Sequence, residues 1–541
     1  MYINFSDIPG HQNLFLDYLN EFNNVEKFYK RNFRDQESYE DLLRQLAIKD
    51  RPHRAALADA IRSQYDEVKT SKPTQTNIEA LYSPKTIAVV TGQQLGILGG
   101  PIYTIYKTIT AIKLCNYLKE KYEGYHFVPI FWLEGDDHDY EEVRSVNLVN
   151  NDNRILNIKY DDGNLDEINR GNIGHLKFTQ NIEQIFSSLL TELRETEFKK
   201  QLVEFLQSIY QPEKTFLETF REIMIRLFDE HGLIVFNPLD PGIKKLLIPI
   251  FTKEITSYRD HTGILVERSA ELEELYHAQV KVKAINLFYI DDNERLLIEP
   301  VDNDYRLKGK RKRFTQEDLL SQVNFTPERF SPNVLLRPIC QDYLFPTAFY
   351  VGGPGEISYF AQVTPLYDLY DITEPIIYPR SSATILEKGV QSILEKYNLN
   401  LIDIFLSEDE LVTKVIMENA GADITNVFGE AIHSLNQIFH PINDKLNSID
   451  KTLSELSNKS KERMEQTIEF LKSKAIEAEK RKHEATIRQL GKVRNVLYPN
   501  DNLQERELNF LYFINKYGTD VLKYIIGELA INKFEHQVIE L

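Results

Sequence analysis

Carboxylates, an imidazole and amide side chains follow two apolar segments that lie close together in the chain. Residues 86–90 (Thr-Ile-Ala-Val-Val) lead into Thr91-Gly-Gln-Gln-Leu-Gly, and residues 127–133 lead into Glu134-Gly-Asp-Asp-His-Asp. Carboxylates beside an imidazole can act as a general base, hold a cation or bind an ammonium group. Glycines let the backbone approach a ligand, and glutamine amides donate hydrogen bonds to carboxylate or phosphate. Together the two segments predict a site for an anionic ligand.

The acidic cluster after residue 133 has two interpretations. Asp136 could cap a following helix while the other side chains face water. Alternatively, Asp137, His138 and Asp139 could carry chemistry, and their position at the end of an apolar strand that contains the only tryptophan, Trp132, favours this function. Because no second histidine or cysteine lies nearby, we expect no metal ligands here and no zinc.

Four glycines, Gly92, Gly96, Gly99 and Gly100, lie in the first loop, before a helix that is expected to open at Pro101. The loop has neither the dinucleotide-binding fingerprint nor the Lys-Ser/Thr ending of a P-loop. A helix N-terminus still offers free N–H groups and the positive end of a dipole, so these glycines could bind the phosphates of a cofactor. The alternative is a tight strand-to-helix turn with solvated amides.

Further candidates lie later in the chain. The loop Gly352-Gly-Pro-Gly-Glu356 could bring its backbone against a ligand, with Glu356 binding an amine or a hydroxyl. Arg337 and Arg380 could each bind a carboxylate or phosphate bidentately, and a structural ion pair is an equal alternative for each. No nucleophile elbow, Cys/His dyad or kinase signature is present.

The composition is that of an acidic globular protein. Among 541 residues, 64 are basic and 82 acidic, a net charge of −18 that disfavours nucleic acid as a partner. The basic run Lys308-Gly-Lys-Arg-Lys-Arg313 is expected to be a solvated loop. Cys115 and Cys340, the only cysteines, lie in apolar surroundings and should be buried. With no signal pattern and no apolar run long enough to span a bilayer, we expect a cytoplasmic protein that does not bind membranes.

The elements that must position these residues alternate between strands and helices. Apolar segments at 86–90, 127–133, 233–236, 345–351 and 375–379 each end in a loop rich in Gly, Pro, Asp or Arg. This order predicts an α/β fold with a doubly wound parallel sheet. Ligands bind at the carboxyl edge of such a sheet, where the strand order switches. We therefore expect the loops that begin near residues 91, 134 and 352 to converge in one cavity.

The regions expected along the chain are a helical segment (1–82), a core (83–385) with insertions at about 145–225 and 260–330, a coiled-coil arm (386–500) and a C-terminal helical segment (501–541). In the arm, apolar spacings of three and four run from Ile438 to Leu456 and restart at Met464. They predict two antiparallel helices separated by Asn458-Lys-Ser460. Such an arm could pair with its twin in a homodimer or pack on itself.

Several motifs jointly resemble one family. They are Thr91-Gly-Gln-Gln-Leu-Gly, Gly100-Pro-Ile-Tyr-Thr-Ile-Tyr-Lys107, Phe131-Trp-Leu-Glu-Gly-Asp-Asp-His-Asp139, Asn333-Val-Leu-Leu-Arg-Pro338, Gly352-Gly-Pro-Gly-Glu-Ile-Ser-Tyr359 and Leu503-Gln-Glu-Arg-Glu-Leu-Asn509. In this order the chain resembles the bacillithiol biosynthesis cysteine-adding enzymes, a family of cysteine ligases, over nearly its whole length.

The resemblance implies a Rossmann-like core with connecting-peptide insertions and a coiled coil used in dimerisation. The implied reaction joins cysteine to glucosaminyl-malate in the last step of bacillithiol biosynthesis. Because a carboxylate is a poor electrophile, we expect ATP, with or without Mg²⁺, to activate it. The positions implied for catalysis are Asp137, His138 and Asp139, and those implied for substrate binding are Gln93, Gln94, Asn333, Arg337, Gly353, Glu356 and Arg380.

Cofactor binding is assigned to Gly92, Gly96, Gly99 and Gly100, and to a second group of Gln504, Arg506 and Asn509. With Glu505, this second group forms either a ligand pocket or a polar network between helices. The chain departs from the family where Tyr106 replaces a histidine and Asp136 replaces a glutamate, and it lacks the HIGH and KMSKS signatures of class I synthetases. Two other functions stay open: a nucleotide-binding dimeric scaffold or partner-dependent subunit, and a metal-dependent hydrolase built on residues 136–139.

Overall fold

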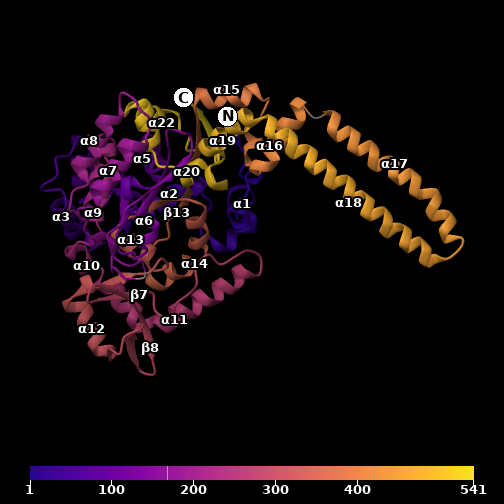
Figure 1. Cartoon of the computed structure of the whole chain (residues 1–541). Coiled ribbons are helices and arrows are strands. Elements are labelled where there is room, and N and C mark those ends of the chain that lie inside the picture. The colour runs from indigo at the N-terminus through magenta and orange to yellow at the C-terminus, as the bar shows by residue number, and fades with distance from the viewer. Residues whose placement is uncertain (167, 421) are drawn as a thin grey trace. The chain divides into compact units, whose positions relative to one another are not determined.

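The computed structural model describes residues 1–166, 168–420 and 422–541 (Figure 1). The chain forms two compact units. Unit 1 contains residues 1–384 and 504–539, and unit 2 contains residues 385–503 and 540–541. Unit 1 is therefore assembled from two stretches of sequence, and unit 2 is inserted between them.

A five-stranded parallel sheet forms the core of unit 1. Its strands are β2 (Thr86–Gln94), β3 (His126–Glu134), β6 (Ile234–Phe236), β12 (Thr347–Gly352) and β13 (Ile376–Pro379). They lie in the order β13-β12-β2-β3-β6, and each neighbouring pair is parallel. Nearly all of their residues are buried, as expected for a parallel sheet covered on both faces. The predicted doubly wound α/β fold is confirmed.

The strand order reverses between β2 and β12. Along the chain, the sheet grows from β2 through β3 to β6 on one side and through β12 to β13 on the other. This is the order of a Rossmann-type sheet, in which ligands bind outside the carboxyl ends of the strands at the point of reversal. The residues that follow Gln94 and Gly352 therefore border the crevice.

The helix after β2 begins later than the sequence suggests. Strand β2 continues to Gln94, a short 3₁₀ turn covers Ile97–Gly99, and helix α5 spans Tyr103–Lys121. Leu98 lies in the left-handed region at φ 55°, as do the two glycines that follow it. Pro101 is bridged to Asn509 instead of opening the helix, so the expected helix start at Pro101 is wrong. The left-handed turn occupies the residues that were expected to lead directly into the helix.

The N-terminal region is helical, as expected, apart from one short strand. Its main helices are α1 (Asn13–Asn20), α2 (Glu37–Ile48), α3 (Arg54–Ser63) and α4 (Lys72–Ala80). Strand β1 (Tyr2–Ile3) pairs antiparallel with β15 (His536–Glu540) near the other end of the chain. A pairing over such a sequence separation leaves no local pattern, so neither strand was predicted.

Both predicted insertions contain strands and helices. The first has the hairpin β4 (Ser145–Val149) and β5 (Ile155–Lys159), followed by α7 (Ile182–Glu192), α8 (Lys199–Ile209) and α9 (Phe216–Phe228). The second has α11 (Ile248–Glu273), a sheet of β7 (Leu287–Asp291), β8 (Glu294–Val301), β9 (Asp304–Leu307), β10 (Arg313–Phe314) and β11 (Phe330–Pro332), and α12 (Gln316–Phe325). The basic run at 308–313 lies at the turn between β9 and β10 and is exposed, which confirms the expected solvated loop.

The remaining core helices of unit 1 are α10 (Pro241–Leu246), α13 (Arg337–Leu344) and α14 (Pro354–Tyr370). Both cysteines are buried and free, as expected. Among the described residues, no helix combines the length and the apolar character that crossing a bilayer requires.

Unit 2 is helical and contains the predicted hairpin of long helices. Its helices are α15 (Lys388–Lys396), α16 (Glu408–Ala420), α17 (Ala422–Asn447), α18 (Lys451–Lys482) and α19 (Glu484–Leu497). Figure 1 shows α17 and α18 side by side, and the amide of Asn443 on α17 donates to Asn458 on α18 at 2.9 Å. The predicted coiled-coil domain is confirmed.

The turn between the two long helices lies at 448–450 and not at the predicted Asn458–Ser460. Asp450 accepts hydrogen bonds from the backbone N–H and the hydroxyl of Thr452, at 2.8 and 2.9 Å, and so caps α18. Ser460 instead donates to the carbonyl of Leu456 within the helix. A polar Asn-Lys-Ser triplet is compatible with an exposed helix when its side chains bond along the helix.

Candidate functional site

The carboxyl ends of β2, β3 and β12 converge in one cavity of about 570 Å³ at the point where the strand order reverses. The residues that line it from these strand ends, from the segments that follow β3 and β12 and from the start of α5 are Gly92, Gln93, Gln94, Tyr103, Lys107, Trp132, Glu134, Asp137, His138, Glu142, Tyr350, Gly353, Pro354, Gly355, Glu356 and Tyr359. The others are Gln279, Val280, Lys281, Lys283, Phe288, Arg295, Pro332, Asn333, Val334, Arg337, Arg380 and Arg506. The parallel sheet therefore brings together most of the positions that the sequence identified.

Positive charge dominates the walls of this cavity. Seven lysines and arginines line it, against four aspartates and glutamates, although the whole chain has a net charge of −18. A concave site with walls of one sign concentrates ligands of the opposite sign. The cavity is thus suited to anionic groups such as carboxylates and phosphates.

A buried ion pair joins α5 to the start of α14 inside the cavity. The Lys107 ammonium lies 2.5 Å from Glu356 and donates to the carbonyl of Gly92 and to Gln93, each at 3.0 Å. Glu356 also accepts from the Gly353 N–H at 2.8 Å. Although burial alone would raise the pKa of Glu356, the charge of Lys107 and these hydrogen bonds lower it. Glu356 is therefore ionised and already bound by protein groups. Its role is to position Lys107.

Arg337 begins helix α13 and lies against a second carboxylate, Glu134. It donates to the hydroxyl of Tyr359 at 2.8 Å, and its Nε lies 3.5 Å from Glu134. Burial raises the pKa of Glu134 to about 7, with Asp136 and Asp137 acting in the same direction and Arg337 against it. A carboxyl with this pKa can exchange a proton near neutral pH. Glu134 is the last residue of the apolar strand β3, but it was not among the residues predicted for the site.

The acidic cluster at 136–139 divides into residues with different roles. Asp136 is buried and paired with Lys244, whose Nζ lies 2.8 Å from Oδ2, and Asn172 donates to it at 3.0 Å. Asp139 caps the short helix α6 (Tyr140–Val143) by accepting from the N–H of Glu142. The expected capping role therefore belongs to Asp139 and not to Asp136.

Asp137 and His138 do face the cavity, where Arg295 holds them. Arg295, on β8, donates to Nδ1 of His138 at 2.9 Å and lies 3.5 Å from Asp137. Gln94 donates to Asp137 at 2.6 Å. Burial opposes the ionisation of Asp137, but the hydrogen bond from the backbone N–H of His138 and the charge of Arg295 lower its pKa to about 2. Asp137 is thus ionised at neutral pH and orients its neighbours.

Arg295 was missed by the sequence analysis because it lies in the second insertion, far along the chain from His138. Its guanidinium also donates to the hydroxyl of Ser331 at 2.9 Å and to the carbonyl of Pro332 at 2.8 Å. It lies 3.8 Å from the ring centroid of Phe288. One planar side chain therefore ties the insertion to the loop after β3.

We expect Arg295→Lys to lower kcat by about 100-fold, because a lysine cannot hold three acceptors in one plane and a displacement of about 1 Å in a site costs that much. The measurement is kcat at saturating substrates, together with thermal unfolding. Arg306→Lys, at an exposed position on the neighbouring strand β9, is the matched control and should leave kcat unchanged. Equal rates for the two variants would contradict the positioning role.

Asn333 lines the cavity but uses its amide locally. Its Oδ1 accepts from the N–H groups of Leu335 and Leu336, and its Nδ2 donates to Asn286 at 2.8 Å. It therefore fixes the start of the helix that carries Arg337. Arg380 lies 2.7 Å from the buried carboxylate of Glu505, so each of the two selected arginines has a carboxylate partner within the protein.

The glycine loop does not present a free helix N-terminus to the cavity. Gly99, Gly100 and Asn509 line neither this cavity nor the smaller one beside it. The Asn509 amide donates to the carbonyls of Leu98 and Gly100, and the N–H of Ile102 donates to the carbonyl of Leu508. The C-terminal segment thus occupies two carbonyls of the loop and one of the N–H groups that were expected to be free for a phosphate.

Of the other cofactor positions, Gly92 and Arg506 line the large cavity, Gly96 lines the smaller one, and Gln504 is buried. Gly92 is needed for close packing, because a Cβ there would lie 2.8 Å from the carbonyl oxygen of Trp132 on β3. Glu505 belongs to a buried polar network with Arg380 and Ser382, which matches the alternative of a packing network for that residue.

The chain matches family models along its whole length. Residues 1–381 match the N-terminal Rossmann-like domain of bacillithiol biosynthesis BshC, and residues 383–541 match the C-terminal coiled-coil domain of BshC. The chain belongs to the BshC family. The resemblance seen in the sequence motifs is therefore confirmed.

Relatives in the BshC family match this chain over most of its length. A protein from Salinibacter ruber is 36% identical over 97% of this chain and 96% of its own length, and one from Chloroherpeton thalassium is 36% identical over 84% and 83%. A protein from Geobacillus kaustophilus is 31% identical over 90% of each chain. All three are named "Putative cysteine ligase BshC". The names of the relatives support a ligase in bacillithiol biosynthesis.

Two features bear on how BshC chemistry fits this chain. Tyr106, where the resemblance implied a histidine, is completely buried on α5 and does not line the cavity. Within the described residues, no group of three or more His, Cys, Asp or Glu side chains is arranged to hold a metal ion. Asp136 pairs with Lys244 and Asp139 caps α6, which leaves only Asp137 and His138 together at the cavity, so the geometry does not favour the metal-dependent hydrolase.

Proposed function

We propose that this BshC family member forms an amide bond between the carboxylate of cysteine and the glucosamine amine of glucosaminyl-malate, the last step of bacillithiol biosynthesis. The observation that carries the proposal is the cation-rich cavity at the switch point of the Rossmann-like sheet, in a family whose relatives are named cysteine ligases. The substrates offer several carboxylates to these cations, and the cavity holds a carboxyl suited to accept a proton.

ATP is the proposed third substrate, because a carboxylate must gain a leaving group before an amine can displace it. A cysteine carboxylate oxygen attacks a phosphorus of ATP, and ADP or pyrophosphate leaves. The amine nitrogen then attacks the acyl carbon, phosphate or AMP leaves, and the amine gives up a proton. The cavity suits a polyanion because exposed Lys281 and Arg506 and half-buried Lys283 add to its buried arginines.

Glu134 is the proposed acceptor of the amine proton. Among the residues first considered, Asp137 has its pKa lowered to about 2 and Asp139 caps a helix, so neither is a suitable base. Nδ1 of His138 lies against the guanidinium of Arg295. The pKa of Glu134, near 7, is closest to the value that a base needs at neutral pH.

The test is incubation of the full-length protein with cysteine, glucosaminyl-malate and Mg-ATP, followed by mass detection of the amide product. Formation of product with ADP would indicate an acyl phosphate, and formation with AMP an adenylate. No product above background with any nucleotide would overturn the ligase proposal for the isolated chain. Product that appears only after a second protein is added would favour the partner-dependent subunit.

We also propose that the arm formed by α17 and α18 joins two copies of the chain. Several large apolar residues of the arm are exposed in the single chain: Val427, Ile438, Ile442, Ile449, Leu456, Met464, Phe470 and Leu471. Exposed apolar residues gathered on a polar helical hairpin are typical of an interaction surface. A second copy of the arm offers the same residues in return.

We expect the double variant Ile442→Glu/Leu456→Glu to be monomeric, because two carboxylates per chain would have to be desolvated at the interface. Light scattering after size exclusion should give twice the chain mass for the native protein and the chain mass for the variant. Glu455→Lys, an exposed charge exchange beside Leu456, is the control and should stay dimeric. A monomeric native protein would refute the proposal.

A further inference from the structure

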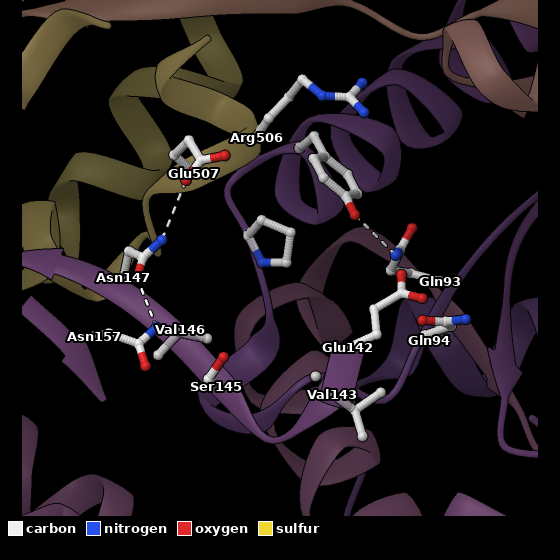
Figure 2. A pocket seen from close by; sticks show the side chains of 13 residues that line it. Gln93, Gln94, Glu142, Val143, Ser145, Val146, Asn147, Asn157, Arg506 and Glu507 are labelled. Atoms are coloured by element: carbon white, nitrogen blue, oxygen red, sulfur yellow. Dashed lines mark hydrogen bonds between the residues drawn. The ribbon is translucent and has the colours of Figure 1, made fainter. Parts of the chain in front are cut away.

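A second, smaller cavity of about 230 Å³ adjoins the large one in unit 1. It is lined by Gln93, Gln94, Gly96, Pro101, Tyr103, Glu142, Val143, Ser145, Val146, Asn147, Asn157, Arg506 and Glu507 (Figure 2). Five of these residues, namely Gln93, Gln94, Tyr103, Glu142 and Arg506, also line the large cavity. The two cavities therefore share a wall, and a ligand could extend from one into the other.

The chemistry of the smaller cavity differs from that of its neighbour. Four amide side chains, a serine hydroxyl and a tyrosine ring line it, with two carboxylates and a single arginine. Amides and carboxylates pair with hydroxyl groups, which both donate and accept. The wall of this cavity thus suits a neutral or cationic ligand rich in hydroxyls, whereas the large cavity suits anions.

Part of this wall is already organised by hydrogen bonds. The Asn147 amide donates to Glu507 at 3.2 Å, and Asn157 donates to Asn147 at 2.8 Å, as the dashed lines in Figure 2 show. Gln93 donates to the hydroxyl of Tyr103 at 3.1 Å. Side chains that are held in place before binding lose less conformational entropy when a ligand arrives.

Glu142 lies where the two cavities meet, with its side chain exposed. Among the described residues, no Lys, Arg or His forms an ion pair with it, and its neighbours Asp137 and Asp139 are acidic. Desolvation is the main cause that raises the pKa of Glu142, and these two carboxylates act in the same direction, against a hydrogen bond from Gln94 and the charge of Lys107. A bound ammonium group would place a positive charge directly against this carboxylate.

We infer that the smaller cavity is the subsite for the hydroxylated amino-sugar ring of the acceptor, with Glu142 placed against its ammonium group. This inference rests on the proposed function, which supplies an acceptor of that chemistry. The malate carboxylates then extend toward the basic wall of the large cavity, and the nitrogen lies at the boundary between the two. The subsite selects an amine over its acetylated form, because acetylation removes the charge that Glu142 balances.

The test is calorimetric titration of the full-length protein with three probes: glucosaminyl-malate, N-acetylglucosaminyl-malate and malate alone. The native protein should bind the free amine at least tenfold more tightly than the acetylated form. Glu142→Gln should remove this preference, and Asn157→Ala should weaken both sugar probes without changing the affinity for malate. Glu141→Gln is the matched control, since Glu141 is the adjacent carboxylate but lines neither cavity.

The possible outcomes separate the subsite from the ligase. If Glu142→Gln and Asn157→Ala bind all three probes like the native protein, the subsite is refuted even where product forms. If the variants lose sugar binding as expected but the native protein makes no product, the subsite stands and the ligase proposal falls. If the native protein binds neither sugar probe, both fail. Thermal unfolding of each variant guards against a loss of binding that comes from misfolding.

Discussion

Asp136→Asn is expected to destabilise unit 1 by about 3–5 kcal/mol, the cost of breaking a buried ion pair by removing one partner. The Lys244 ammonium would remain buried with the carbonyl of Phe330, at 3.1 Å, and no counter-charge from Asp136. Trp132, the only tryptophan, lies in β3 close to Asp136 in sequence, so its fluorescence reports the unfolding. Urea titration followed at this residue measures the effect.

Asp137→Asn is the matched comparison for Asp136→Asn. It should lower activity while changing stability little. Its carboxylate is partly exposed, and Arg295 would keep its bonds to Ser331 and Pro332, so the expected cost is only about 1–2 kcal/mol. Activity should fall instead, because the charge that orients His138 is lost. If the two variants were equally stable, the division of this acidic cluster into a structural and a functional aspartate would be wrong.

Glu134→Gln is expected to lower kcat by about 10²–10⁴-fold, the usual contribution of a general base. A base acts in its ionised form, and the pKa of Glu134 is about 7. The rate of the native enzyme should therefore rise with pH and reach half of its plateau near pH 7. In the glutamine variant this limb of the profile of kcat against pH should vanish.

Glu134→Asp supplies the control for that experiment, since it restores a carboxyl group with a shorter reach. This variant should recover part of kcat, and its kcat should again rise with pH. Because the amine of the substrate also titrates, any dependence of kcat on pH that remains in Glu134→Gln belongs to the substrate. An unchanged profile in the glutamine variant would remove Glu134 from the chemistry and return the role to His138.

The sheet and the convergence of its loops could be predicted from the sequence, because both follow from local rules. Apolar segments ending in polar loops indicate parallel strands, and parallel strands place those loops at one edge. Gln93, Asp137, Glu356 and Arg380 could therefore be assigned to one site before their contacts were known. The prediction depended on the order of elements and needed no knowledge of distant pairings.

The partners of these residues could not be predicted, because they come from distant parts of the chain. Lys244 neutralises Asp136, Arg295 holds His138, and Asn509 occupies the carbonyls of the glycine loop. Sequence spacing carries no record of such tertiary pairs. For the same reason, the raised pKa of Glu134 was invisible, since burial is its main cause.

The turn of the arm shows a different limit. Residues 458–460 are all polar, whereas 448–450 include Ile449, which continues the apolar helical spacing across the true turn. The choice between them depends on the capping of α18 by Asp450 and on the pairing of Asn443 with Asn458. Periodicity alone therefore located two helices but not the boundary between them.

The discontinuous make-up of unit 1 has a consequence for its synthesis on the ribosome. Glu505 and Asn509 complete the environment of Arg380 and of the glycine loop, yet both are translated only after the whole of residues 385–503. Contacts across such separations slow folding, since the intervening loop must be closed first. The binding site of the nascent chain therefore stays incomplete while residues 385–503 are synthesised. A chain that ended before residue 504 would leave Arg380 and the glycine loop without these two partners.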